Sequence, residues 1–356
     1  MDKQYGDAMR GYWNYLLAFP DPPSAGSAMY WMGRCYEKLG DYGKALYLYG
    51  RTQEIANASY YGQRALEAKT VLQKLRIEES TPVSELDFER VITICDGIQF
   101  APVLLPEPHK AAVQVIERAR RLVHGDLHDL ALSYLSWGIR QYPDNKESLH
   151  YIMSRIYESR GDYYESIVSL RRAFADYYGR PIESLPDQVW RLLFPVQHWE
   201  IISTQAVKAK LDPRLVLGII RQESAFEEKA RSSAGARGLM QILPSTGQTL
   251  ARQARLSRYN SSKLFEAETN IALGIRYLTS LLQKYEKTEL ALSGYNAGET
   301  RVKRWVKEFG DTDMAEFVEQ IPFSETRNYV KRVLGHKAYY ELLISSPKST
   351  SRRETE

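Results

Sequence analysis

Apolar residues recur at three- and four-residue spacing along almost the whole chain. Leu132, Leu135 and Ile139 follow this spacing in the first half, and Ile275 and Leu278 follow it in the second. It is the period of an amphipathic α-helix, whereas the strict alternation of apolar and polar residues in a half-buried strand is nearly absent. The pattern therefore predicts an all-α protein.

A thirteen-residue segment occurs twice in the chain. Residues 30–42 (YWMGRCYEKLGDY) align without gaps on residues 151–163 (YIMSRIYESRGDY), and in both copies a Gly-Asp pair supplies a turn between two helices. The spacing resembles the tetratricopeptide (TPR) pattern of stacked helical hairpins. Residues 1–192 are therefore expected to form a TPR-like α-solenoid, a fold that serves for packing and spacing. Small residues are expected where the paired helices cross: Gly33 and Ala45 in the first copy, Ser154 and Ser166 in the second.

The charge of the chain changes where the repeat spacing stops, near Leu193. Residues 1–200 hold 23 Lys and Arg against 26 Asp and Glu, whereas residues 201–356 hold 25 against 18. A basic half favours a polyanionic partner, and nucleic acid, an anionic membrane and an acidic cell-wall polymer all fit this charge. We expect a second domain over residues 193–345 and a disordered tail over residues 346–356, which are polar and include a proline.

Several classes of protein are disfavoured. No apolar stretch approaches the ~20 residues of a membrane-spanning helix, and the first residues do not open a signal peptide, so the chain is either cytosolic or has lost a targeting segment. Cys35 and Cys95 are too few for a disulfide scaffold, and the sequence leaves open whether they pair. His124 and His128 flank a predicted turn, so we expect no metal site and no cofactor. Basic residues lack interleaved aromatic residues, which disfavours nucleic acid as a partner.

Asp212 and Pro213 mark the start of a helix, with Asp as the N-cap and Pro at the first helical position. The helix is expected to end near Glu223, which shares one face with Val216 and Ile220. Burial on such a face disfavours the charged form of a carboxyl and raises its pKa, as a general acid requires near neutral pH. A carboxylate that only accepts structural hydrogen bonds fits the same pattern.

Five segments resemble motifs of the soluble lytic transglycosylases, enzymes with a goose-lysozyme-like catalytic domain. Residues 221–226 (RQESAF) and 232–246 (SSAGARGLMQILPST) resemble the signature around the catalytic glutamate of that family. Residues 270–278 (NIALGIRYL), 291–298 (ALSGYNAG) and 321–330 (IPFSETRNYV) resemble three further motifs in the same order. The resemblance implies a lysozyme-like α-helical catalytic domain, and the family also carries helical hairpins upstream of it.

The resemblance further implies that the protein cleaves the β-1,4 bond between N-acetylmuramic acid and N-acetylglucosamine in peptidoglycan without water, leaving a 1,6-anhydro ring. Glu223 would act first as the acid and then as the base. The other acids close in sequence, Glu227 and Glu228, lie outside the motif, and one carboxylate suffices if the acetamido group of the substrate stabilises the anomeric centre. The implied partner is the peptidoglycan glycan strand in the periplasm or cell envelope, and the helical repeats could hold a protein partner.

Further site residues follow from the matching motif positions. By the resemblance, Ser232 and Tyr295 contact and polarise the acetamido group. The resemblance also implies a second set of residues that line the sugar cleft: Gln241, Leu243, Asn296, Glu325 and Tyr329. Three residues are expected to be structural, two as tight turns and one as a possible helix cap: Gly235, Gly238 and Asn270. An alternative interpretation pairs Glu325 with Arg327 or Arg301 in an ion pair.

Two alternative functions stay open. A muramidase would use the same site but admit water, and would give reducing ends instead of anhydro ends. A non-catalytic scaffold would grip glycan with the lysozyme-like domain and bind a protein on its helical repeats. The Glu223 motif argues against the scaffold, because a binding protein has no use for a proton donor at the scissile bond.

Overall fold

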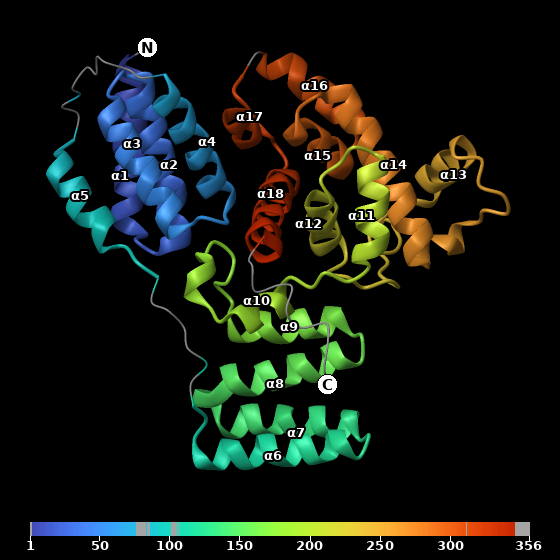
Figure 1. The fold of residues 1–356 in the computed structure, drawn as a ribbon. Coiled ribbons are helices and arrows are strands. Elements are labelled where there is room, and N and C mark those ends of the chain that lie inside the picture. Colours follow the sequence, from blue (N-terminus) through green and yellow to red (C-terminus); the bar gives the residue numbers. More distant parts are fainter. Residues whose placement is uncertain are drawn as a thin grey trace. The chain divides into compact units, whose positions relative to one another are not determined.

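The computed structural model describes residues 2–75, 83, 86–100, 105, 107–310 and 312–345. Throughout these residues the chain forms α-helices and short 3-10 helices, and the only β-type pairing among them consists of two isolated bridges, Arg231 with Arg237 and Arg237 with Ile242. The all-α prediction is therefore confirmed (Figure 1). The tail predicted at residues 346–356 lies outside the described residues.

The chain divides into two compact units that do not follow the chain order. Unit 1 holds Met1–Leu104 and Ala175–Asp187, and unit 2 holds Leu105–Phe174 and Gln188–Glu356. The second repeated hairpin thus belongs to the same unit as the C-terminal half of the chain. The domains expected from the sequence, residues 1–192 and 193–345, are defined by repeats and motifs and not by spatial contacts. They stay a prediction.

Unit 1 is built mainly from helices that pack pairwise in chain order. Its interior is rich in tyrosine, with Tyr30, Tyr36, Tyr49 and Tyr60 at most 1% exposed. Tyrosine fills the space of a core residue and keeps a hydroxyl that can find a partner. The elements of unit 1 are α1 (Asp2–Ala18), α2 (Pro22–Lys38), α3 (Tyr42–Ile55), α4 (Tyr60–Lys74), α5 (Phe88–Gly97) and η2 (Ile182–Ser184).

The repeated segment forms a helical hairpin in both units, as predicted. In unit 1 a Cβ atom on Gly33 would lie only 2.8 Å from the ring of Tyr49, so the absence of a side chain lets α2 and α3 approach. In unit 2 the hydroxyls of Ser154 and Ser166 lie 2.7 Å apart at the corresponding crossing. The prediction that small residues occupy these crossings is confirmed for Gly33, Ser154 and Ser166.

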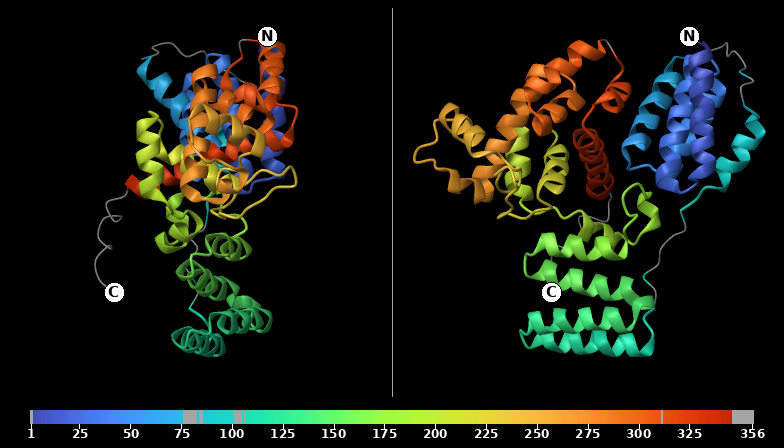
Figure 2. Two further views of the ribbon diagram at one scale, coloured as in Figure 1. Left: turned by 90° about the vertical axis from the view of Figure 1, so that its right-hand side faces the viewer. Right: turned by 180° about the vertical axis from the view of Figure 1, so that it is seen from behind.

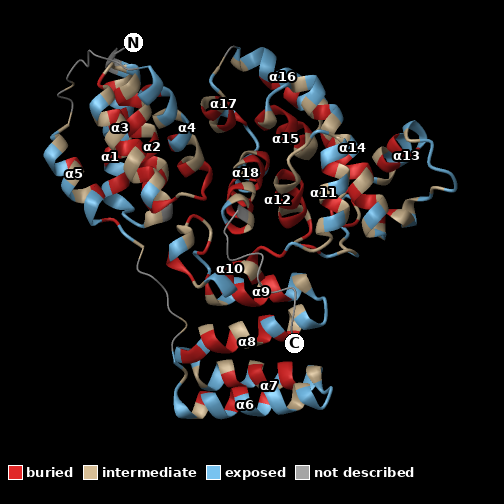
Figure 3. Ribbon diagram, viewed as in Figure 1, coloured by how far each residue is buried: buried red, intermediate tan, exposed pale blue. Residues whose placement is uncertain are grey.

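Unit 2 begins with four antiparallel helices stacked in chain order, shown as successive layers in Figure 2. Buried residues such as Val115, Leu135, Leu149 and Met153 form one apolar cluster between them, on the faces coloured as buried in Figure 3. The elements are α6 (Lys110–His124), α7 (His128–Gln141), η1 (Pro143–Asn145), α8 (Lys146–Ser159) and α9 (Tyr163–Ala173).

The rest of unit 2 is a helical domain centred on the contact between two helices, α12 and α18. A Cβ on Gly218 of α12 would lie 2.9 Å from the carbonyl oxygen of Val333 on α18, so the two backbones are nearly in contact. The elements of this part are α10 (Asp187–Leu193), α11 (Trp199–Lys208), α12 (Pro213–Glu223), α13 (Pro244–Gln253), η3 (Ser261–Phe265), α14 (Ala267–Tyr285), α15 (Thr288–Ala297), α16 (Glu299–Phe309), α17 (Met314–Gln320) and α18 (Ser324–Ser345).

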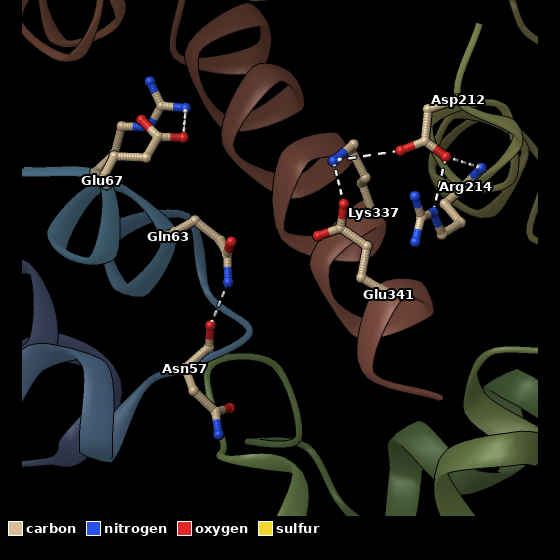
Figure 4. Close-up of polar contacts among 8 residues, drawn as sticks. Asn57, Gln63, Glu67, Asp212, Arg214, Lys337 and Glu341 are labelled. Carbon is tan, nitrogen blue, oxygen red and sulfur yellow. Dashed lines mark hydrogen bonds and ion pairs between the residues drawn. The ribbon is translucent and has the colours of Figure 1, made fainter. Parts of the chain in front are cut away.

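Helix α12 starts as the sequence predicts. The carboxylate of Asp212 accepts a hydrogen bond from the backbone N–H of Arg214 at 2.9 Å and another from the Arg214 side chain at 2.8 Å. Lys337 of α18 lies 3.5 Å from the same carboxylate and also pairs with Glu341 (Figure 4). These contacts hold the first turn of α12 against α18 and so help to set the orientation of α12, whose last residue is Glu223.

Two remaining expectations concern membranes and cysteines. Among the described residues, no helix is both long and apolar enough to cross a bilayer. Cys35 and Cys95 are both buried thiols.

Candidate active site

Glu223 is the last residue of α12 and is partly buried. The preceding residues Val216, Ile219 and Ile220 are completely buried, so α12 presents its terminal carboxyl at the edge of an apolar core. This burial raises the pKa of Glu223 from its ordinary 4.5 to about 7. The side chain therefore keeps its proton near neutral pH, as a general acid must.

Two residues of α18, one helical turn apart, act on the Glu223 carboxyl. The buried hydroxyl of Tyr329 interacts with it and holds the pKa lower than burial alone would. The negative charge of Glu325 works in the opposite direction and raises the pKa of Glu223. Glu325 and Tyr329 are four residues apart, so both lie on the same face of α18.

Tyr295 of α15 also lies near the carboxyl. Burial, with a contribution from the charge of Glu223, raises the pKa of Tyr295 well above its ordinary value, so its hydroxyl stays protonated. The hydroxyl donates to the carbonyl oxygen of Met240 at 2.9 Å, and the ring packs against Tyr277 with centroids 5.1 Å apart. With its proton committed to Met240, the Tyr295 oxygen can accept a hydrogen bond from a ligand.

The loop between α12 and α13 supplies three of the expected residues. The Ser232 oxygen accepts the backbone N–H of Ala236 at 3.0 Å, which leaves its own O–H available as a donor at an exposed position. Gln241 has a left-handed backbone, and its amide nitrogen donates to the carbonyl of Gly238 at 2.9 Å, which leaves its side-chain oxygen as an acceptor. Leu243 is 42% exposed, which is unusual for leucine and suits the wall of a cleft.

Asn270 is completely buried on α14 and binds this loop. Its side-chain oxygen accepts the N–H of Met240 at 2.7 Å, and its amide nitrogen donates to the carbonyls of Arg237 at 2.8 Å and Leu264 at 2.7 Å. It does not cap α14, whose N-cap position is Glu266, so the capping interpretation is wrong.

The two glycines of the same loop have positive φ angles, +81° for Gly235 and +74° for Gly238. A Cβ on Gly238 would lie 2.1 Å from the carbonyl oxygen of Leu264, whereas a Cβ on Gly235 would meet nothing within 4 Å. Both positions thus need the backbone freedom of glycine, and Gly238 needs its small size as well.

Asn296 and Glu325 lie side by side at a pocket of about 360 Å³. The Asn296 amide nitrogen is 3.5 Å from the Glu325 carboxylate, and the Thr326 hydroxyl donates to the Asn296 side-chain oxygen at 2.7 Å. The alternative ion pairs of Glu325 are not formed. Arg327 donates instead to the carbonyl of Ile321 at 3.0 Å, and Arg301 donates to that of Ala297 at 2.7 Å.

The structure therefore brings Tyr295, Glu325 and Tyr329 near the carboxyl of Glu223. The other expected residues, Ser232, Gln241 and Leu243, lie on the loop between α12 and α13. Sequence reasoning missed the carbonyl of Met240, because a backbone acceptor leaves no trace in residue type. It also missed Ser224, which follows Glu223 directly and donates to the carbonyl of Leu239 at 2.9 Å. The only feature of the sequence that could have indicated Ser224 was its position directly after Glu223.

Comparison with known proteins shows which families the C-terminal half of the chain is similar to. Residues 200–318 match the Transglycosylase SLT domain, and residues 320–349 match the Soluble lytic transglycosylase helical domain. The soluble lytic murein transglycosylase of Escherichia coli (strain K12) is 38% identical over 154 residues, which cover 42% of this chain and 24% of that protein. Membrane-bound lytic murein transglycosylase C of Histophilus somni is 26% identical over 276 residues, covering 66% of this chain and 75% of that protein.

The solved structures give the same result for the fold. The crystal structure of the 70-kDa soluble lytic transglycosylase from Escherichia coli superposes with a TM-score of 0.63 at 24% identity, covering 90% of this chain and 46% of that chain. Another structure of the 70-kDa soluble lytic transglycosylase is a complex with bulgecin A. This chain spans about a quarter of the length of the soluble relatives that it matches.

Proposed function

We propose that this chain, which matches the Transglycosylase SLT domain over residues 200–318 and is homologous to soluble lytic murein transglycosylases, cleaves the MurNAc-GlcNAc β-1,4 bond of peptidoglycan without water. The observation that carries the proposal is the carboxyl of Glu223 at the edge of the apolar core, where burial raises its pKa to about 7, beside two tyrosines that stay protonated. In this proposal residues 193–345 form the catalytic domain and residues 1–192 the helical-repeat domain.

Glu223 serves both chemical steps. It first donates its proton to the glycosidic oxygen, so that the bond to the muramyl C1 breaks and the leaving sugar departs as an alcohol. The carbonyl oxygen of the muramyl acetamido group attacks C1 and holds the positive charge in an oxazolinium ring. The Glu223 carboxylate then takes the proton of the C6 hydroxyl, whose oxygen attacks C1. The bond between C1 and the acetamido oxygen breaks in the same step, which restores the neutral acetamido group and leaves the 1,6-anhydro ring. The carboxyl ends in its starting protonation state.

The acetamido group meets complementary partners. As the oxazolinium forms, its N–H becomes more acidic, and the Tyr295 oxygen can accept it because its own proton goes to Met240. The free O–H of Ser232 can donate to an oxygen of the bound sugar. The remaining cleft residues would bind and orient the strand: Gln241 through its side-chain oxygen, Leu243 as an apolar wall, and Asn296, Glu325 and Tyr329 from α15 and α18.

The substrate places the enzyme in the cell envelope, outside the cytoplasmic membrane. Its relatives are named soluble or membrane-bound lytic murein transglycosylases. Fractionation of cells that express the native gene should recover the protein with envelope markers, and recovery with cytoplasmic markers alone would contradict this location.

We also propose that the helical repeats bind a protein partner of acidic, amphipathic character. Leu127, Leu130 and Trp137 of the α7 region are exposed, and Arg118 and Arg121 of α6 line an adjoining pocket of about 320 Å³. An apolar surface flanked by arginines complements a helix with an apolar stripe and acidic neighbours. A fluorescent peptide of that design should bind the full chain and lose affinity for Trp137→Ala. Equal binding to both proteins would contradict the proposal.

The catalytic proposal is tested by digesting purified peptidoglycan with wild type and Glu223→Gln and identifying the released muropeptides by mass spectrometry. Anhydro-muramyl products, one water lighter than reducing-end products and absent with the variant, are expected. Reducing-end products that depend on Glu223 would identify a muramidase. No products from the folded wild type would leave only the glycan-binding scaffold.

A further inference from the structure

A two-residue stretch of backbone, Leu239–Met240, connects three helices at the site. The Ser224 hydroxyl, at the C-terminus of α12, donates to the carbonyl of Leu239 at 2.9 Å. The N–H of Met240 donates to the Asn270 side chain on α14 at 2.7 Å, and the carbonyl of Met240 accepts the Tyr295 hydroxyl from α15 at 2.9 Å. The stretch thus links the residue after Glu223 to the Tyr295 hydroxyl, whose pKa is raised by the nearby charge of Glu223.

Asn270 holds this stretch in place. Its side chain is completely buried and forms three hydrogen bonds of 2.7 to 2.8 Å, to Met240 and to the carbonyls of Arg237 and Leu264. Packing supports the same arrangement, because a Cβ on Gly274 of α14 would lie 2.2 Å from the Met240 sulfur. No other side chain of the described site bonds to the Met240 N–H.

We infer that Asn270 is a positioning residue of the proposed reaction: by fixing Met240, it sets where the Tyr295 hydroxyl lies relative to the Glu223 carboxyl. This inference rests on the proposed transglycosylase function. The Asn270 side chain is completely buried, so it acts through the backbone that it holds, and Met240 is the part of that backbone that bonds to Tyr295. A misplacement of about 1 Å at a reacting group can lower a rate by about 100-fold, which gives such a positioning role a measurable size.

A double-mutant cycle separates positioning from simple stability. The variants are Asn270→Ala, Tyr295→Phe and the two combined, assayed on soluble glycan strands with rates corrected for the folded fraction. Asn270→Ala should lower kcat by about 10- to 100-fold and change KM less. In the Tyr295→Phe background the same substitution should lower kcat by less than about 3-fold, because no hydroxyl is left to position. Equal effects of Asn270→Ala in both backgrounds would overturn the inference.

Two further variants keep the test decisive. Asn270→Asp is isosteric, and complete burial against the carbonyls of Arg237 and Leu264 disfavours its charged form. The protonated acid keeps the acceptor for Met240 and one donor for the two carbonyls. It should recover most of the kcat that Asn270→Ala loses, and no recovery would count against positioning. If Asn270→Ala does not fold, Ser224→Ala releases the same stretch from its other end, and its effect on kcat should also shrink in the Tyr295→Phe background.

The outcome also distinguishes this inference from the proposed function. If the wild type forms anhydro products but the effects of Asn270→Ala and Tyr295→Phe on kcat are additive, only the positioning role is overturned. A wild type that forms none would overturn both, because the positioning role is defined for that reaction.

Discussion

Replacing Glu223 with glutamine should stabilise the protein at alkaline pH while it abolishes activity. Burial raises the pKa of this carboxyl from 4.5 to about 7. Since one pKa unit corresponds to about 1.4 kcal/mol, the ionised carboxylate lowers the free energy of unfolding by about 3 kcal/mol. Burial of Glu223 thus lowers stability when the carboxyl is ionised but supplies a proton donor near neutral pH.

The sign and the pH window follow from proton binding. Between pH 4.5 and pH 7 the folded protein holds the Glu223 proton more tightly than the unfolded chain does, so stability falls as the pH rises through this window. Below pH 4.5 the carboxyl is protonated in both states and the penalty is absent. Glutamine carries no charge at any pH, so the variant should gain little at pH 4.5 and about 3 kcal/mol at pH 8.

Urea unfolding followed by circular dichroism at pH 4.5, 6 and 8 measures this difference. Glu227→Gln is the matched control, because Glu227 is exposed and close in sequence, and it should stay within about 0.5 kcal/mol of wild type at each pH. A Glu223→Gln variant that is destabilised at pH 8, or whose difference from wild type does not change with pH, would refute the reasoning.

Two further predictions concern the charges and the loop of the site. Above pH 7 kcat/KM should fall as Glu223 ionises. Tyr329→Phe should move this fall to higher pH, because Tyr329 lowers the pKa of Glu223, and Glu325→Gln should move it to lower pH, because Glu325 raises that pKa. pH–rate profiles that shift in the same direction for both variants would contradict the assignment. Gly238→Ala should lower the free energy of unfolding by more than about 2 kcal/mol, and Gly235→Ala by only about 1 kcal/mol, because only Gly238 also meets a backbone oxygen. Equal losses in urea unfolding would count against this packing.

The helices and hairpins could be predicted from the sequence because their causes are local. Apolar spacing defines a helical face, and the Gly-Asp pairs at 40–41 and 161–162 place the turns. The φ angles of Gly40 and Gly161 are +85° and +79°, as such turns require. The division into two units was not predictable in the same way, because it depends on contacts between segments that are far apart in the chain.

The same contrast between local and long-range features applies to the site. The apolar face that ends in Glu223 was visible in the sequence, and with it the direction of the pKa change. The opposing influences of Tyr329 and Glu325 depend on how α18 packs on α12, which no spacing reveals. Asn270 illustrates the limit most clearly: its residue type fits a helix cap, but the structure commits all three of its hydrogen bonds to backbone atoms of other segments.

The central claim is that Glu223 catalyses cleavage in which an intramolecular hydroxyl replaces water. Digestion of peptidoglycan in water enriched in oxygen-18, followed by mass spectrometry of the fragments, tests it most directly. The account predicts anhydro-muramyl ends without the heavy isotope, formed by wild type and not by Glu223→Gln. Reducing ends that carry one oxygen-18 atom would show that water attacks the muramyl carbon, and would contradict it.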